Sequence, residues 1–199
     1  MKLVLASRNK HKIKEWEATL ARFVEGVELL SLDEVGITED IEENGTTFEA
    51  NALLKAQAAA RSGYPSIGED SGLEVHALGG EPGVYSARYA GEHGNDRANN
   101  ALLLEKLHAL GAEDRSASFV CAIACVMPDG EQFFCRGEAP GVIIDEYRGE
   151  GGFGYDPLFY VPELGKTFAE MTAAEKNSIS HRGRAIELFA EKLNKLKRG

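Results

Sequence analysis

The sequence contains few cysteines, and their spacing is not that of a zinc site. Only Cys121, Cys125 and Cys135 occur among 199 residues, and all three lie in apolar sequence of the kind found in strands. There is no Cys-x-x-Cys pair, and no histidine stands among them. The pattern predicts buried free thiols rather than a disulfide framework or a bound zinc ion.

Long apolar runs and an excess of positive charge are also missing. No run approaches the roughly 20 apolar residues of a membrane helix, and the apolar stretch after Met1 is too short for a signal peptide. A formal charge of −10, from 22 basic and 32 acidic residues, opposes general affinity for nucleic acid or anionic membranes. We therefore expect a cytoplasmic protein with no nucleic-acid partner and no membrane partner.

The chain does contain enough apolar sequence for a sizeable core. Hydrophobic residues make up 43% of the chain, and no internal repeat, low-complexity tract or long linker divides it. We expect residues 1–199 to form one domain.

Helix and strand patterns alternate in the first half, and a hairpin follows. Thr46 and Glu49 have the spacing of a capping box, as do Thr172 and Glu175, and each pair predicts a helix start. Two apolar strands flanking the turn at 128–130 predict an antiparallel hairpin. This order indicates an α/β fold with a mixed sheet, flanking helices and two lobes around a central substrate cleft. The expected strands are 2–6, 27–30, 73–78, 116–127 and 131–137; the expected helices are 10–23, one from the Thr46 cap to 61, one from Asn95 or Asp96 to 110, a short one after Thr172 and a last one after 184.

The stretch at 67–75 has the composition of an active-site corner. Gly68 and Gly72 let the backbone bend tightly, so that Asp70 and Ser71 would project at the tip. A carboxylate there could bind magnesium or act as a base towards water. The alternative is ordinary turn chemistry, in which Asp-Ser-Gly is common.

Cations crowd the start of the helix at 10–23. Arg8, Lys10, Lys12 and Lys14 lie at the end that already carries the positive helix dipole, where each exposed cation is unfavourable by about 0.3–1 kcal/mol. A bound polyphosphate would make this placement favourable. A solvated basic face screened by salt is the alternative.

The same arrangement recurs before the last helix, at Lys176, His181, Arg182 and Arg184. Lys55 is a single lysine on an alanine-rich helix, where it could bind phosphate or serve only for solubility. Two helix starts with unexpected cations point to an anionic ligand.

Two further segments suit a nucleotide. The acidic stretch 33–43, which ends in Glu42 and Glu43, could hold a metal ion or be a solvated loop. In residues 151–157 glycines alternate with aromatic residues, which suits stacking on a flat ring, although Phe153 could instead pack into the core. No Walker motif and no Gly-x-Gly-x-x-Gly occurs, which disfavours P-loop enzymes and dinucleotide dehydrogenases. A nucleoside triphosphate with magnesium satisfies all of these features.

Six segments, in order, resemble those of the inosine triphosphate pyrophosphatase family over nearly the whole chain. Ser7 stands where the family often has Thr, and Glu69 stands where a neighbouring Asp is common. The segments are Ser7-x-Asn9-x-x-Lys12; Thr47-Phe48-Glu49-Ala50-Asn51-Ala52 with Lys55; Asp70-Ser71-Gly72-Leu73; Gly79-Gly80-x-Pro82-Gly83-x-Tyr85-Ser86-Ala87-Arg88-Tyr89; Phe153-Gly154-Tyr155-Asp156-Pro157; and Ser180-His181-Arg182.

The resemblance implies an elongated mixed sheet, a homodimer and a magnesium-dependent hydrolase. It implies that water attacks the α-phosphorus of ITP, dITP or XTP, which gives the monophosphate and pyrophosphate and removes these nucleotides from the pool. Asp70 would be the catalytic base and a metal ligand, with Glu42 or Glu43 as a further ligand. By position, the triphosphate would be held by Ser7, Arg8, Asn9, Lys10, His11, Lys12 and Lys55, the substrate would contact Ser71, and the base and ribose would contact Phe153, Gly154, Tyr155, Asp156, Lys176, His181 and Arg182.

Base selectivity would then depend on donors aimed at the 6-keto oxygen of hypoxanthine or xanthine, where adenine presents an amino group. His181 and Arg182, supported by Lys176, are the candidate donors. A mismatched buried donor is unfavourable by roughly 1–3 kcal/mol. Two alternatives remain at this point: a related pyrophosphatase for pyrimidine or modified nucleotides, and a catalytically silent nucleotide sensor.

Overall fold

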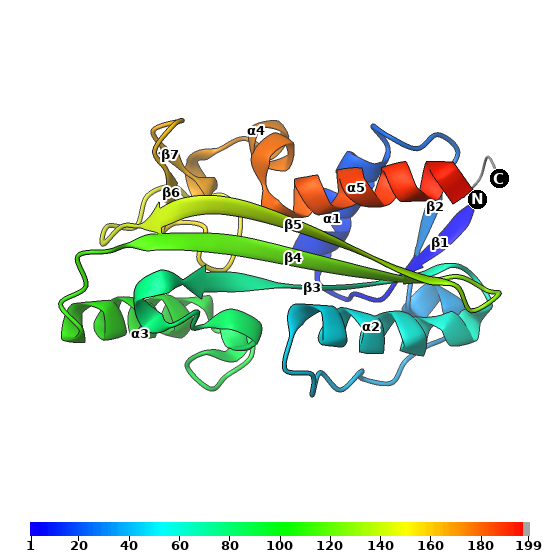
Figure 1. Cartoon of the computed structure of the whole chain (residues 1–199), viewed down its shortest axis with the longest axis horizontal. Helices are drawn as coiled ribbons and strands as arrows, with labels where there is room; N and C mark the ends of the chain where they lie inside the picture. The colour runs from blue at the N-terminus through cyan, green and yellow to red at the C-terminus, as the bar shows by residue number, and fades with distance from the viewer. Residues whose placement is uncertain (197–199) are drawn as a thin grey trace. The chain divides into compact units, whose positions relative to one another are not determined.

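A computed structural model describes residues 1–196, which contain a seven-stranded mixed sheet of order β2-β1-β3-β4-β5-β6-β7 (Figure 1). β1 pairs in parallel with β2 and β3, whereas β6 pairs antiparallel with β5 and β7. The predicted α/β class with a mixed sheet and flanking helices is therefore confirmed. The strands are β1 (Lys2–Leu5), β2 (Glu28–Ser31), β3 (Ser66–Val75), β4 (Ser116–Val126), β5 (Gln132–Ile143), β6 (Phe159–Val161) and β7 (Lys166–Thr167).

The chain divides into two compact units. The first holds residues 1–70, 121–137 and the segment that begins at 181, and the second holds residues 71–120 and 138–180. The predicted single domain, of which 197–199 lie outside the described residues, stays a prediction, as do the elongated shape and the central cleft. The helices are α1 (Lys10–Leu20), α2 (Phe48–Ala59), α3 (Asp96–Ala109), α4 (Ala173–Ile179) and α5 (His181–Leu196).

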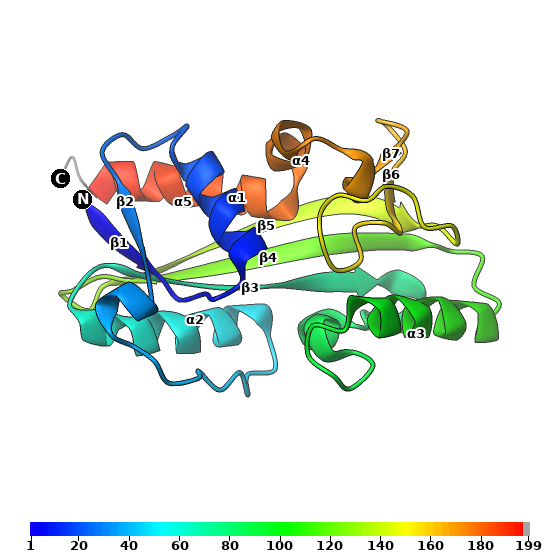
Figure 2. The ribbon, with the colours of Figure 1, turned by 180° about the vertical axis from the view of Figure 1, so that it is seen from behind.

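In the first unit, helices cover both faces of the sheet. α1 and α5 lie on one face and α2 on the other (Figures 1 and 2). The core on the α1 side includes Trp16, which is fully buried and meets the ring of Phe189 edge-on at 5.5 Å between centroids. The indole of Trp16 also donates to Glu69 on β3, which holds α1 beside that strand, where the candidate site lies.

The second unit has its own apolar core. Phe119 on β4 packs against Phe159 on β6 and against Phe168, with ring centroids 4.5 and 5.5 Å apart. α3 is capped by Asn95, whose side chain accepts a hydrogen bond from the amide of Ala98. This confirms Asn95, rather than Asp96, as the cap of that helix.

The predicted corner at 67–75 is wrong as local geometry. β3 is one ten-residue strand that runs through it, so Asp70 lies in the middle of a strand rather than at the tip of a bend. Gly68 is required for another reason: a Cβ there would lie 1.9 Å from the carbonyl oxygen of Ala52. The glycine lets the backbone of α2 approach the sheet closely.

Gly68→Ala is therefore expected to destabilise the protein by about 3 kcal/mol or more, at or above the top of the usual range for overpacking, because α2 would have to move off the strand. The measurement is the free energy of unfolding in urea. Gly63→Ala is the control, since Gly63 has a φ of +78° but open space around it, so that only the backbone penalty of about 1–2 kcal/mol applies. Equal losses in the two variants would contradict the close-contact explanation.

Several predicted boundaries need correction. Helix 10–23 ends at Leu20, and the strand expected at 73–78 ends at Val75. The cap of α2 is Thr47 rather than Thr46, and Glu49 pairs with Arg136 instead of completing a capping box. The Thr46 prediction failed because two adjacent threonines offer the same cap and sequence spacing alone does not choose between them. The capping box of Thr172 with Glu175 and the hairpin of β4 with β5 are confirmed, although β5 runs on to Ile143.

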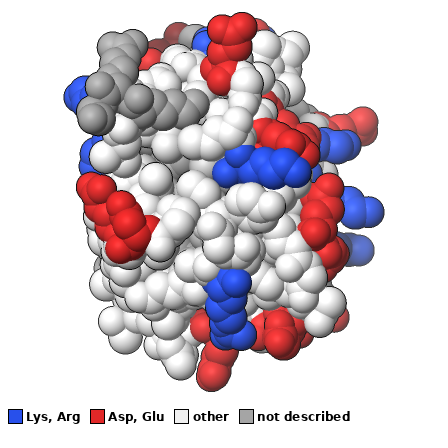
Figure 3. Space-filling view, turned by 90° about the vertical axis from the view of Figure 1, so that its right-hand side faces the viewer, with Lys and Arg blue, Asp and Glu red and all other residues white. Residues whose placement is uncertain are grey.

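The prediction of buried free cysteines is confirmed. All three thiols are free and buried, and burial raises the pKa of Cys125 to about 12. No helix within residues 1–196 is long and apolar enough to cross a membrane. On the face shown in Figure 3, acidic and basic side chains are interspersed. The absence of a nucleic-acid partner stays a prediction.

Candidate active site

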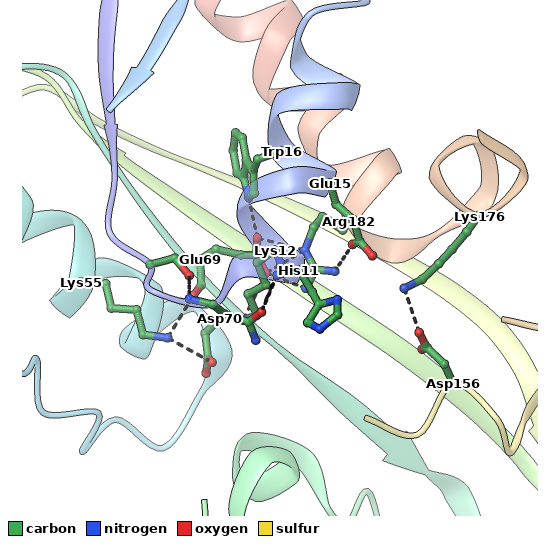
Figure 4. A network of polar contacts seen from close by, with 12 residues as sticks. His11, Lys12, Glu15, Trp16, Lys55, Glu69, Asp70, Asp156, Lys176 and Arg182 are labelled. Atoms are coloured by element: carbon green, nitrogen blue, oxygen red, sulfur yellow. Dashed lines mark hydrogen bonds and ion pairs between the residues drawn. The ribbon is translucent and has the colours of Figure 1, made fainter. Parts of the chain in front are cut away.

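The site is built around Asp70, which lies on β3 and is only 6% exposed. α2 supplies its neighbours: the amide nitrogen of Asn51 donates to Asp70 Oδ2 at 3.1 Å, and Lys55 Nζ lies 3.5 Å from Oδ1 (Figure 4). Asn51 and Lys55 are four residues apart and so share a helix face. Burial raises the pKa of Asp70, and the charge of Lys55 only partly opposes that effect. Such a carboxyl is better suited to accept a proton near neutral pH than an exposed one.

Lys55 also joins the acidic stretch to the strand. Its Nζ lies 2.9 Å from a carboxylate oxygen of Glu43 and donates to the carbonyl of Glu69 at 3.0 Å. Glu42 instead lines a cavity of about 330 Å³, together with Leu54 and Gln57 of α2. The structure thus brings Glu43, rather than Glu42, into the same cluster as Asp70.

Glu69 points to the opposite face of β3, as successive strand residues must. It receives hydrogen bonds from Arg182 at 2.8–3.1 Å and from the indole of Trp16 at 2.5 Å, and it pairs with Lys12 at 3.3 Å. Burial alone would raise the pKa of Glu69, but the charges of Arg182 and Lys12 hold it well below its usual range. Figure 4 shows this second buried cluster beneath the start of α1.

These contacts change the interpretation of the cations at the helix starts. Arg182, only 1% exposed, also donates to Glu15, so two carboxylates of the protein neutralise it. Arg8 reaches the acidic stretch, where it donates to the carbonyl of Ile37 at 2.9 Å. A bound polyphosphate is therefore not needed to explain Arg8 or Arg182. Lys176 lies in the last turn of α4, where a cation is favoured, and not at the start of the last helix as predicted.

Some of the free backbone N–H groups at the start of α1 are already bound by the helix cap. The side chain of Asn9 accepts hydrogen bonds from the amides of His11 and Lys12 at 3.0 and 3.3 Å, and Ser7 Oγ accepts from the amide of Asn9. Two of the N–H groups at this helix start, which could otherwise bind a phosphate, are thus already used. Lys10 and His11 are exposed and Lys12 is half-buried, and phosphate binding by these three side chains stays a prediction.

The glycine-aromatic segment forms a third cluster, in the second unit. Lys176 Nζ lies 2.8 Å from Asp156 Oδ2, and both residues are buried. The same ammonium lies 5.0 Å from the centre of the Phe153 ring. Tyr155 is a core residue whose hydroxyl donates to the carbonyl of Ser86. Phe153, Gly154, Asp156 and Lys176 are thus brought together, whereas the Tyr155 ring points into the core.

A metal ion at this site would have few protein ligands. Residues 1–196 contain no cluster of three or more His, Cys, Asp or Glu arranged to hold a metal ion. Asp70 and Glu43 are the two carboxylates that meet at Lys55. Magnesium commonly binds through one or two carboxylates and completes its shell with water and substrate phosphates. The donor set fits that mode.

Three residues of these clusters had no role in the sequence analysis. Asn51 holds Asp70, while Glu15 and Glu69 compensate Arg182. For Asn51, the sequence does carry a signal: it lies four residues before Lys55, so both side chains share one face of the helix. No local pattern signals Glu15 or Glu69, because Arg182 is more than a hundred residues away.

Comparison with known protein families shows which family this chain belongs to. The family model described as the Ham1 family matches residues 3–192. The chain belongs to the Ham1 family. Among Ham1 relatives, the dITP/XTP pyrophosphatase of Clostridium perfringens is 49% identical, with 96% of this chain and 97% of the relative covered. The dITP/XTP pyrophosphatase of Mycolicibacterium paratuberculosis is 51% identical, with 98% and 97% covered.

Solved Ham1 structures share the fold. The HAM1 protein of Coxiella burnetii superposes with a TM-score of 0.89 at 43% identity, covering 98% of this chain and 99% of that one. The Ham1 protein of Staphylococcus aureus gives 0.86 at 45% identity, with 98% of both chains covered. The predicted resemblance to this family of pyrophosphatases is confirmed over nearly the full length.

Proposed function

We propose that this protein hydrolyses dITP, ITP and XTP to the monophosphate and pyrophosphate. The observation that carries the proposal is the identity of about half of all residues with proteins named dITP/XTP pyrophosphatase, over nearly the whole chain. The buried cluster of Asp70, Lys55 and Glu43 supplies a base and a charged setting for such a reaction.

Asp70 is the proposed base, which takes a proton from the attacking water. Its raised pKa supports this role, because a stronger base removes that proton more readily. Lys55 and Lys12 are proposed to neutralise the triphosphate, which carries more charge than the ordinary carboxylate partners of these lysines. Attack at the α-phosphorus needs such charge neutralisation more than it needs covalent help.

Magnesium is the proposed cofactor, held by Asp70 and Glu43. When bound, it would neutralise charge on the phosphates and fix their orientation. The two carboxylates that converge there, those of Asp70 and Glu43, support magnesium at this place, because carboxylate oxygens are its preferred protein ligands.

Glu43→Gln is expected to raise the magnesium concentration for half-maximal activity by about tenfold, the size expected when one ligand of a weak site is lost. Glu42→Gln should leave that concentration unchanged, because Glu42 lines the cavity beside α2 instead. The measurement is a magnesium titration of pyrophosphate release for both variants. An effect confined to Glu42→Gln would reverse the assignment.

Base recognition is proposed to involve the cluster of Phe153, Asp156 and Lys176, with His181 and Arg182 as candidate donors. Lys176 beside the Phe153 ring combines a flat apolar surface with a donor, which suits a keto-bearing purine. For Arg182, the donor role stays a prediction, because Glu69 and Glu15 occupy its guanidinium in this structure.

The experiment that tests the function is pyrophosphate release from ITP, dITP, XTP, GTP and dUTP, each with magnesium. The proposal predicts that the first three turn over fastest. A clear preference for dUTP would favour a pyrimidine enzyme, and binding of ITP without product would favour a silent sensor. The homodimer and the cytoplasmic location stay predictions; sedimentation equilibrium tests the first.

A further inference from the structure

Asn100, in the second unit, is a buried polar residue that packing alone does not explain. It lies on α3, is 3% exposed, and its amide nitrogen donates to the carbonyls of Asp96 and Gly154, both at 2.9 Å. Within residues 1–196 its Oδ1 has no hydrogen-bond partner. A buried acceptor without a partner is unfavourable for stability. The residue is therefore better explained by what its two N–H groups hold.

The amide of Asn100 has only one acceptable orientation. Rotation by half a turn would place Oδ1 against the two carbonyl oxygens of Asp96 and Gly154, and acceptors do not bind acceptors. Asn100 therefore acts as a double donor that ties Gly154 to α3.

Gly154 is held from its other side as well. Its N–H donates to Asp96 Oδ2 at 2.8 Å. Asp96 and Asn100 are four residues apart on α3 and so share a face. Two side chains of one helix thus bind both backbone polar groups of a single residue, whose φ of +63° favours glycine.

The turn that contains Gly154 also carries the groups assigned to the base. The N–H of Phe153 donates to Asp156 Oδ2 at 3.1 Å, and the N–H of Asp156 donates back to the carbonyl of Phe153 at 3.2 Å. Lys176 completes the cluster through Asp156 and the Phe153 ring. Because the turn is closed on itself, a shift of Gly154 moves Phe153 and Asp156 together.

We propose that Asp96 and Asn100 are positioning residues that hold turn 153–156 in the conformation that receives the nucleobase. The inference rests on the proposed function, in which this turn binds the base. Residues of this kind act before the chemical step, by keeping the binding conformation populated. Their loss raises KM in proportion to the lost population and leaves kcat nearly unchanged.

The test compares two adjacent asparagines. Asn100→Asp keeps the shape but replaces the double donor with an acceptor that faces two carbonyls. Asn99→Asp is the matched control, because Asn99 is equally buried on the same helix but binds the amide of Ala90 and the carbonyl of Ala87 instead. Kinetics with ITP and magnesium and hydrogen exchange at 153–156 are measured for both variants and for the unaltered protein.

Asn100→Asp is expected to raise KM at least about tenfold, with kcat within about threefold and faster exchange of the Gly154 amide. Asn99→Asp should change neither the KM nor that exchange. Asp96→Ala gives a second, independent reading, since Asp96 is exposed and its removal leaves the core intact; its KM should rise about fivefold.

The proposal is overturned if Asn99→Asp and Asn100→Asp raise KM equally, or if Asp96→Ala leaves both KM and exchange unchanged. Absence of ITP hydrolysis by the unaltered protein would instead overturn the proposed function. In that case the exchange comparison still decides whether α3 holds the turn, since it needs no turnover.

Discussion

Asp70→Asn is expected to lower kcat for ITP by about 100- to 10,000-fold, the range associated with loss of a general base. The amide keeps the shape of the carboxyl, and its oxygen can still accept the hydrogen bond from Asn51. Its NH2 group would face Lys55, which keeps Glu43 and the carbonyl of Glu69 as partners, so the fold should persist. The comparison is pyrophosphate release at saturating ITP and magnesium. Asp129→Asn is the control, because Asp129 is an exposed aspartate in the turn between β4 and β5.

The same substitution has a predictable effect on stability. The pKa of Asp70 is raised in the folded state, so folding takes up a proton between the unfolded pKa, about 3.9, and that raised value. Ionised Asp70 therefore lowers the stability of the protein as pH rises through this window. Asp70→Asn lacks this loss and should be at least as stable as the unaltered protein at neutral pH.

The pH dependence of the activity should also reflect the ionisation of Asp70. The acid limb of kcat/KM should belong to Asp70, because only ionised Asp70 accepts the proton. The residual activity of Asp70→Asn should not show that limb. Unchanged kcat in the variant would remove Asp70 from the mechanism.

Glu69→Gln is expected to lower the free energy of unfolding by about 3–5 kcal/mol, because it leaves Arg182 buried with one carboxylate fewer. Arg182 and Glu69 are both almost completely buried and share three hydrogen bonds. Urea unfolding at neutral pH measures the loss. Glu49→Gln breaks the Glu49–Arg136 pair, which is more than a third exposed on both sides, and should change stability by less than about 1 kcal/mol.

The pH dependence of the free energy of unfolding distinguishes the charge interaction of Glu69 with Arg182 from a loss of packing. The pKa of Glu69 is lowered well below its usual range in the folded state. Its contribution is therefore fully present above the unfolded pKa, about 4.3, and is lost as pH falls towards the lowered folded value. The stability of Glu69→Gln should vary less with pH in this window. Equal losses for Glu69→Gln and Glu49→Gln would contradict the account of the buried cluster.

Helix starts could be predicted from the sequence because capping is local. Asn95 and Thr172 each bond to amides within three residues, so their signals lie within a few positions. The alternation of helices and strands gave the α/β class for the same reason. At Thr46 the local signal failed only by one residue, since Thr47 offers the same hydroxyl.

The full extent of β3 could not be predicted, because the contacts that require its glycine at 68 come from α2, elsewhere in the chain. Gly68 and Gly72 look like turn residues, but Gly68 is there for the backbone of α2. Asp70 was identified from its composition and its family motif, while its setting between Asn51 and Lys55 required the packing of α2 on β3. The same holds for Arg182, whose partners Glu15 and Glu69 are remote in sequence.

The acidic stretch shows a different limit. Glu42 and Glu43 are adjacent acids in a loop without periodicity, so nothing local distinguishes them. In the structure the loop directs Glu43 to Lys55 and leaves Glu42 at the cavity beside α2. Only the path of the loop over the helix makes that choice.

In the proposed reaction, water activated at Asp70 attacks the α-phosphorus of the nucleotide. Hydrolysis of ITP with magnesium in water enriched in the heavy oxygen isotope identifies the attacked phosphorus, because the product that carries the label is the one that was attacked. We expect label in the monophosphate and none in the pyrophosphate. Label in the pyrophosphate, or release of orthophosphate as the first product, would contradict it.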